Sequence, residues 1–254
     1  MCLEPKRTVI VTGAAKGIGL AIARAFVEQG DYVCFADLDR TAAIEASRQF
    51  GQSAKGYYVN VADERSVREF IEEVITDRGT IDVLVNNAGL QHIDKVEEFP
   101  TDKWRLLIDV ILTGTFLMTK YTIPYMKEKK FGRIINISSV HGKLASPYKS
   151  AYVSAKHGVV GFSRAVALET AREGITVNTI MPGPVKTRMI NDQLTRLAEE
   201  EDCSLDDVMK KYVLGRQPMN RFIEPEEIAS IALYLGSNQA AAITGEEISV
   251  SGGI

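Results

Sequence analysis

The stretch that decides the fold is Val9-Ile-Val-Thr-Gly-Ala-Ala-Lys-Gly-Ile-Gly19. It opens with a β-branched apolar run, which predicts a buried strand, and its glycines then mark a tight turn. Four apolar residues in and after the stretch follow the spacing of one helix face: Ile18, Ile22, Ala25 and Phe26. The sequence therefore predicts a strand, a glycine-rich turn and a helix in direct succession, with Gly30 as the helix stop.

Strand-like runs alternate with helix-like segments along the rest of the chain. Seven runs are predicted strands: 7–12, 32–37, 56–59, 81–86, 133–138, 175–180 and 247–250. The first six are continuously apolar, which indicates strands covered on both faces. Strand–helix alternation implies parallel neighbours and right-handed crossovers. We therefore expect an α/β fold, a single doubly wound (Rossmann-type) parallel sheet of about seven strands with helices on both faces, spanning residues 1–254 as one domain.

Composition narrows the classes of function. The chain has 254 residues, of which 45% are hydrophobic and 25% charged, and its formal net charge of −3 argues against a nucleic-acid-binding domain. No unbroken apolar run reaches about 18 residues, so no membrane span is expected. Three scattered cysteines and the lack of a signal sequence favour a reducing, cytoplasmic location. The three histidines lack metal-ligand spacing, so no metal site is predicted.

One segment interrupts the strand–helix rhythm. Residues 188–222 are polar, helical in pattern, and lie between the sixth predicted strand and the final helix. Long insertions between regular elements are often functional. We therefore predict a substrate lid over residues 188–222.

The glycine spacing G-x-x-x-G-x-G predicts a phosphate-binding loop. Gly13 permits the tight turn, Gly17 allows close approach of a pyrophosphate, and Gly19 lets the helix pack on the strand. Amide groups at the helix N-terminus would then face the negative phosphates. The alternative is a glycine-rich turn with no ligand, which the position of the loop at the first strand–helix junction disfavours.

A carboxylate at the end of the second predicted strand indicates which dinucleotide is bound. Asp37 follows Gly19 by 18 residues and can accept hydrogen bonds from a ribose 2′-hydroxyl, whereas it would repel a 2′-phosphate. Lys16 favours the phosphorylated cofactor, but more weakly than Asp37 opposes it. The predicted cofactor is therefore NAD. The alternative reading is that Asp37 only caps the turn after its strand.

Three residues form a candidate catalytic set. Tyr152 and Lys156 lie four apart, so they share one face if helical. A neighbouring ammonium favours the phenolate form of a tyrosine, which otherwise has a pKa near ~10. Ser139 ends the fifth predicted strand, and ligands bind at the carboxyl ends of such strands. Ser138 is the competing serine, but alternation sends the two side chains to opposite faces.

These motifs together resemble the short-chain dehydrogenase/reductase superfamily. The matching pieces are 12–19, Asn86-Asn-Ala-Gly89, Ser139 with Tyr152 and Lys156, and Met181-Pro-Gly-Pro-Val-Lys-Thr187, in the order of that family. The resemblance implies a dehydrogenase in which these residues bind the cofactor: Gly13, Lys16, Gly17, Ile18, Gly19, Asp37, Asn60, Val61, Asn87, Ala88, Gly89, Tyr152, Lys156, Pro182, Gly183, Val185 and Thr187. At the adenine, Asn60 would accept through its carbonyl oxygen.

A narrower resemblance concerns the substrate. Segments 89–93, 97–104, 140–152 and 221–227 are similar to bacterial NAD-dependent D-3-hydroxybutyrate dehydrogenases. By that resemblance, Gln91, His141, Lys149 and Gln193 would hold the carboxylate of a small hydroxy acid or keto acid, next to Ser139 and Tyr152. The resemblance also implies a homotetramer. Apolar residues around much of the circumference of segment 104–126 agree with that assembly.

Three departures from the family pattern keep other functions open. Ile111 stands where many members have an Asn that helps to hold a water in the proton relay. Pro184 occupies a position where the hydroxybutyrate enzymes commonly have a Trp, and their usual Trp-containing tail is absent after Ile254. The alternatives to a hydroxybutyrate dehydrogenase are a reductase of a 3-oxoacyl thioester or a sugar acid, and a non-catalytic nucleotide-binding protein.

Overall fold

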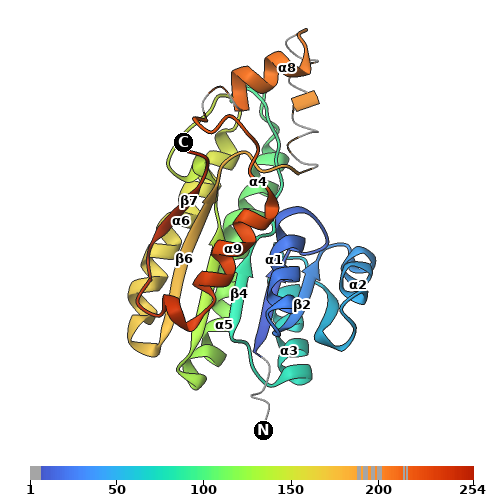
Figure 1. Cartoon of the computed structure of the whole chain (residues 1–254), viewed down its shortest axis with the longest axis vertical. Helices are drawn as coiled ribbons and strands as arrows, with labels where there is room; N and C mark the ends of the chain where they lie inside the picture. The colour runs from blue at the N-terminus through green and yellow to red at the C-terminus, as the bar shows by residue number, and fades with distance from the viewer. Residues whose placement is uncertain are drawn as a thin grey trace.

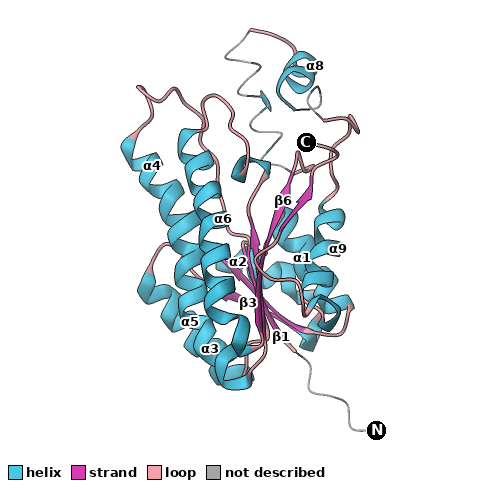
Figure 2. Cartoon of the chain, turned by 90° about the vertical axis from the view of Figure 1, so that its left-hand side faces the viewer, coloured by secondary structure: helices cyan, strands magenta, loops and turns pink. Residues whose placement is uncertain are grey.

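The computed structural model describes residues 7–187, 190, 194–195, 198, 202–213, 215 and 217–254. Within them the predicted architecture is confirmed. Seven parallel strands form one sheet in the order β3-β2-β1-β4-β5-β6-β7. Helices cover both of its faces (Figure 2). The order reverses between β1 and β4, and at such a switch point parallel sheets bind their ligands.

The strands run over Thr8–Thr12 (β1), Tyr32–Asp37 (β2), Ala54–Tyr58 (β3), Val83–Asn86 (β4), Gly132–Ile137 (β5), Ile175–Pro182 (β6) and Glu247–Val250 (β7). Every residue of β1, β4, β5 and β6 is buried, as continuous apolar runs predict. The expectation for the third strand was wrong in one respect. In β3 only Tyr57 is buried, because β3 is the edge of the sheet.

The main helices run over Gly17–Glu28 (α1), Arg40–Arg48 (α2), Glu64–Arg78 (α3), Thr101–Ile108 (α4), Gly114–Lys129 (α5), Ser150–Thr170 (α6) and Pro225–Leu235 (α9). Helices α1 and α9 pack on one face, while α3, α5 and α6 pack on the other (Figure 2). Helix α1 buries Ile22 and Phe26 as predicted, and Gly30 follows it with φ +99°. Its buried face also includes Ala23, whereas Ile18 and Ala25 are only partly buried.

A long apolar helical run belongs to the core. Helices α4 and α5 are joined by the π-helical turn Asp109–Thr113 (η2), and the run Thr101–Lys129 is long and apolar enough to cross a membrane by composition alone. Its side chains Leu107, Ile111 and Met118 are fully buried within the domain. The run is therefore a core helix of this domain.

Two arginines connect the sheet to the end of α9. The guanidinium of Arg7 forms a salt bridge with Asp31 at 2.7 Å and donates a hydrogen bond of 2.6 Å to the carbonyl of Gly236. Arg133 donates one of 3.1 Å to the carbonyl of Ser237. Cations at these carbonyls complement the negative end of the helix dipole.

Part of the predicted lid, 188–222, lies outside the described residues. Its described residues include the short helix Leu205–Val208 (α8) and the π-helical turn Met209–Val213 (η5). Leu194 and Val208 pack against Ile93, in the loop after β4. Helix α8 lies at the end of the molecule to which the carboxyl ends of the strands point (Figure 1). A lid function for the segment stays a prediction.

Candidate active site

The glycine loop has the geometry that a pyrophosphate requires. Gly13 and Gly17 adopt positive φ angles of +64° and +58°, and a Cβ on Gly19 would lie 2.2 Å from the Gly13 carbonyl oxygen. Helix α1 starts at Gly17, and its N-cap residue Lys16 makes no side-chain hydrogen bond to the helix. The amide groups of the first turn are therefore open to an anion.

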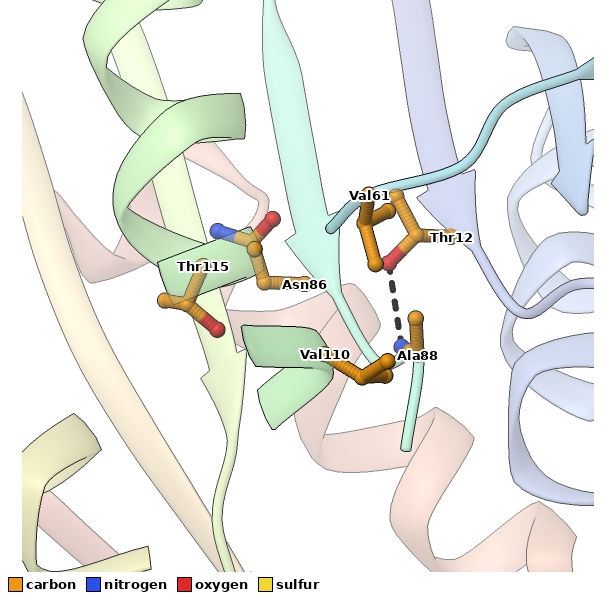
Figure 3. Close-up of a pocket in the computed structure, with 7 residues that line it drawn as sticks. Thr12, Val61, Asn86, Ala88, Val110 and Thr115 are labelled. Carbon is orange, nitrogen blue, oxygen red and sulfur yellow. Dashed lines mark hydrogen bonds between the residues drawn. The ribbon is translucent and has the colours of Figure 1, made fainter. Parts of the chain in front are cut away.

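The end of β4 is fastened to this loop through Thr12. The hydroxyl oxygen of Thr12 accepts hydrogen bonds from the backbone amides of Asn87 and Ala88, each of 3.0 Å. The side chain of Asn87 donates to the Thr12 carbonyl at 2.9 Å. Figure 3 shows Thr12 and Ala88 facing a small pocket that Val61 and Val110 also line. The predicted segment from Asn87 to Gly89 thus lies beside the glycine loop, whereas the role of Thr12 was missed.

Asp37 faces the same loop. Its carboxylate accepts a hydrogen bond from the Ala15 amide and another from the Asp39 amide, both of 3.1 Å. The side chain therefore caps the turn after β2 and also lies against the phosphate loop, so the two readings of this residue are compatible. At the adenine end, the side-chain oxygen of Asn60 accepts from the Ala62 amide at 3.1 Å. If that oxygen also accepted a hydrogen bond from adenine, it would do so in addition to the one from the Ala62 amide.

The segment after β6 reaches the glycine loop. Pro182 ends the strand, and the Gly183 amide donates to the Val250 carbonyl at 2.9 Å. Val185 is buried and pairs with Ile223. The methyl group of Thr187 lies 3.6 Å from the position of a Cβ on Gly17. The described residues of both predicted cofactor segments therefore lie next to the glycine loop, and the loop's positive-φ glycines and open amides fit the pyrophosphate of a dinucleotide.

The three predicted catalytic residues also come together. Ser139 follows β5 and caps the short 3₁₀ helix Val140–Gly142 (η3), and its side chain is hydrogen-bonded to the phenol of Tyr152. Lys156 lies one turn further along α6, with its ammonium 5.5 Å from the centroid of the Tyr152 ring. It donates a hydrogen bond of 2.7 Å to the Ile137 carbonyl. Ser138 is excluded from this group, because its hydroxyl donates to the Lys156 carbonyl at 3.0 Å.

Burial dominates the electrostatics of this set. It raises the pKa of Tyr152, and the hydrogen bond with Ser139 lowers that pKa only in part. It also lowers the pKa of Lys156 to about 7. The sequence predicts a phenol made more acidic by the ammonium, but in the structure the pKa of Tyr152 is raised, because desolvation is its largest cause. A further positive charge beside the phenol would favour its ionised form.

Three of the four predicted carboxylate ligands lie within the described residues, and Gln193 lies outside them. Gln91 uses its side-chain oxygen to accept from the His92 amide at 3.0 Å. Burial lowers the pKa of Lys149, and no hydrogen bond or ion pair is seen between its ammonium and the part of the chain that the structure describes.

His141 lies beside the catalytic set and has both ring nitrogens engaged. Nδ1 shares a hydrogen bond of 3.3 Å with Ser139 Oγ, and Nε2 shares one of 3.0 Å with Ser146 Oγ. The ring packs edge-on against Tyr152, with 5.9 Å between centroids. Sequence reasoning missed Ser146, since its contact depends on the course of the loop after η3 rather than on a spacing rule.

Known oxidoreductases are similar to this chain over nearly its whole length. A family model described as enoyl-(acyl carrier protein) reductase matches residues 13–254. An uncharacterised oxidoreductase of Bacillus subtilis is 41% identical, with 98% of each chain covered. A D-beta-hydroxybutyrate dehydrogenase of Cupriavidus necator is 39% identical, with 97% of each covered. A 3-oxoacyl-[acyl-carrier-protein] reductase of Vibrio harveyi is 37% identical, with 100% of this chain and 99% of the relative covered.

Proposed function

The chain belongs to the short-chain dehydrogenase/reductase family of oxidoreductases, and we propose that it interconverts D-3-hydroxybutyrate and acetoacetate with NAD. One observation carries the reaction type. Tyr152 is hydrogen-bonded to Ser139 and has Lys156 one turn along the same helix, and the Lys156 ammonium lies 4.0 Å from the position of a Cβ on Gly89.

In oxidation, Tyr152 accepts the proton of the substrate hydroxyl as general base. The Ser139 hydroxyl donates a hydrogen bond to the same oxygen and stabilises its developing negative charge. The Lys156 ammonium favours the phenolate and also binds the nicotinamide ribose. The nicotinamide, when bound, accepts the hydride, so the protein supplies geometry and proton transfer.

The preference for NAD rests on Asp37. Its carboxylate is held against the glycine loop by the Ala15 amide, where it would accept a hydrogen bond from a ribose 2′-hydroxyl. Placing a second anion there costs Coulomb energy, so the phosphorylated cofactor is disfavoured.

Lys149 supports an anionic substrate. A partly buried ammonium without a partner among the described residues is costly unless an anion neutralises it. It lies close enough to His141 to lower the pKa of that imidazole. We therefore assign the substrate carboxylate to Lys149, with Gln91 and Gln193 as further donors. The carboxylate contact of His141 stays a prediction, because serines already occupy both of its ring nitrogens.

The substrate assignment can be tested against its main alternative, a 3-oxoacyl thioester, which lacks a free carboxylate. We expect Lys149→Ala to raise KM for D-3-hydroxybutyrate at least tenfold, because a charged hydrogen bond to the carboxylate is lost. The matched control is Lys95→Ala, which removes an exposed lysine from a neighbouring loop. A thioester or sugar-acid reductase would keep its activity on those substrates in the Lys149→Ala variant. A wild-type protein that binds NAD but oxidises none of these compounds would support a non-catalytic role.

The proposal includes a cytoplasmic homotetramer. Three large apolar side chains on the α4–η2–α5 run are exposed: Trp104 (36%), Leu106 (42%) and Phe116 (43%). Burial of exposed apolar side chains favours association between proteins. Sedimentation of the wild type and of a Phe116→Glu variant tests this, with a loss of assembly expected in the variant.

A further inference from the structure

The phenol of Tyr152 must exchange its proton with water once in every turnover. Its ring packs against an apolar cluster that includes Leu107 and Ile111, and Ile111 is 1% exposed. The Ile111 carbonyl accepts a hydrogen bond of 2.7 Å from the Thr115 hydroxyl. Among the described residues, this wall therefore offers no polar side chain that could take a proton from the phenol.

A continuous row of hydrogen-bonding groups leaves Tyr152 in another direction. The phenol is hydrogen-bonded to Ser139, whose Oγ lies 3.3 Å from Nδ1 of His141. On the far side of the imidazole, Nε2 lies 3.0 Å from Oγ of Ser146. The two links through His141 are thus within hydrogen-bonding distance, and the hydrogen bond between Ser139 and Tyr152 joins them to the buried phenol.

The row ends at solvent. Ser146 lines an open cleft of about 460 Å³, together with Asp94, Glu97 and Tyr148. The Asp94 amide donates a hydrogen bond of 2.9 Å to the Tyr148 carbonyl, which ties the two walls of the cleft together. Carboxylates that line such an open cleft can accept protons and pass them to bulk water.

We propose that Ser139, His141 and Ser146 conduct the proton between Tyr152 and this cleft. This proposal rests on the proposed function, since a proton has to be conducted from Tyr152 only if Tyr152 acts as general base. His141 and Ser146 do not touch the reacting atoms. They act through Ser139, as relay groups.

The proton movements balance along the row. After the ketone has left, the Ser139 hydroxyl no longer donates to a substrate oxygen. At that stage the phenol donates to Ser139, Ser139 donates to Nδ1 of His141, and the hydrogen on Nε2 is donated to Ser146. The phenol proton passes to Ser139 Oγ as the proton of Ser139 passes to Nδ1. The Nε2 proton then passes to Ser146, which releases its own proton to water. The products are phenolate, two neutral hydroxyls, an imidazole in its other tautomer and one proton in solvent. Rotation of the hydroxyls and of the ring resets the row.

The charge state of His141 suits this task. Burial, together with the charges of Lys149 and His157, lowers its pKa to about 4. The other titratable group that faces the imidazole is Tyr152 itself. At neutral pH the ring is therefore uncharged, with one nitrogen able to accept a proton and the other able to donate one.

Ser146→Ala tests the relay, with Ser150→Ala as its matched control. Ser150 lines the same cleft, and its hydroxyl has no hydrogen-bond partner among the described residues. We expect Ser146→Ala to lower kcat for oxidation three- to tenfold, to increase the solvent deuterium isotope effect on kcat, and to leave KM for the hydroxy acid unchanged. Added imidazole buffer should restore kcat, since it can carry the proton from His141. Ser150→Ala should match the wild type.

His141→Gln separates the relay from a carboxylate contact. The relay predicts a loss of kcat that imidazole restores, whereas a substrate ligand predicts a rise in KM alone, which would overturn the proposal. Equal kcat and isotope effects in Ser146→Ala and wild type would overturn it as well. A measurement without turnover is the rate of tyrosinate formation after a pH jump, with Tyr152→Phe as the blank. This rate should fall in Ser146→Ala even if D-3-hydroxybutyrate proves not to be the substrate.

Discussion

Replacing Asp37 by Asn should relax the choice between NAD and NADP. The side-chain oxygen of Asn can still accept from the Ala15 amide, as the carboxylate does at 3.1 Å, so the loop keeps its support. The charge is what changes. A 2′-phosphate in place of the ribose hydroxyl would lie within about 4 Å of the carboxylate, where two unit charges repel by about 4 kcal/mol at an effective dielectric constant of about 20.

That figure must be discounted, because Asp37 is partly exposed and water screens its charge. We expect about half of it, about 2 kcal/mol, which corresponds to a roughly 30-fold gain in kcat/KM for NADP. The loss with NAD should be smaller, since Asn can still accept from the 2′-hydroxyl. Initial rates of reduced cofactor formation give both constants.

The matched control is Asp39→Asn. Asp39 is the next carboxylate along the chain, but it caps α2 by accepting from the Ala42 amide at 3.0 Å and is exposed to solvent. Its charge should therefore affect both cofactors alike. An unchanged NAD-to-NADP ratio in Asp37→Asn, or an equal change in both variants, would refute the assignment of Asp37 to the ribose.

Three further predictions concern catalysis, the glycine loop and pH. Tyr152→Phe should lower kcat by roughly 10²–10⁴-fold with little change in NAD affinity, measured by initial rates and fluorescence titration; near-normal turnover would contradict a general base at this position. Gly19→Ala should abolish NAD binding, because its Cβ would collide with the Gly13 carbonyl, whereas Gly161→Ala, with nothing within 4 Å, should stabilise α6 by about 0.5–1 kcal/mol in thermal unfolding. Lys156→Met should be more stable than wild type below pH 7, and this difference should shrink as pH rises from about 7 toward the usual lysine range. The reason is that between these values the unfolded lysine holds a proton that the folded one has lost. A difference in urea unfolding that does not vary with pH would show that the side chain is not desolvated.

The fold was predictable because its signals are local. Continuous apolar runs of four to eight residues indicate buried strands. All seven strands overlap their predicted ranges: β2 and β7 match them outright, and the ends of the other five shift by at most two residues. The exposure of β3 was not predictable, because it depends on which strand lies at the edge of the sheet, and the runs themselves do not contain that order.

The site was predictable where it depends on short spacing or on strand ends. Helical periodicity places Tyr152 and Lys156 on one face, and the end of β5 places Ser139 opposite them. Ser146 was not predictable, because its loop passes through Tyr148, whose φ of +65° no sequence rule assigns to a tyrosine. The rise in the pKa of Tyr152 was also missed, since desolvation depends on how completely neighbouring elements enclose the phenol.

The arginine contacts at the end of α9 have a consequence for the order of folding events. Arg7 and the Gly236 carbonyl are separated by 229 residues, and Arg133 and the Ser237 carbonyl by 104. Such long loops are slow to close, so these contacts should form after the folding barrier has been crossed. Removing either guanidinium should therefore leave the refolding rate almost unchanged and accelerate unfolding. The contacts between the first strand and the last helix would then set the lifetime of the native state.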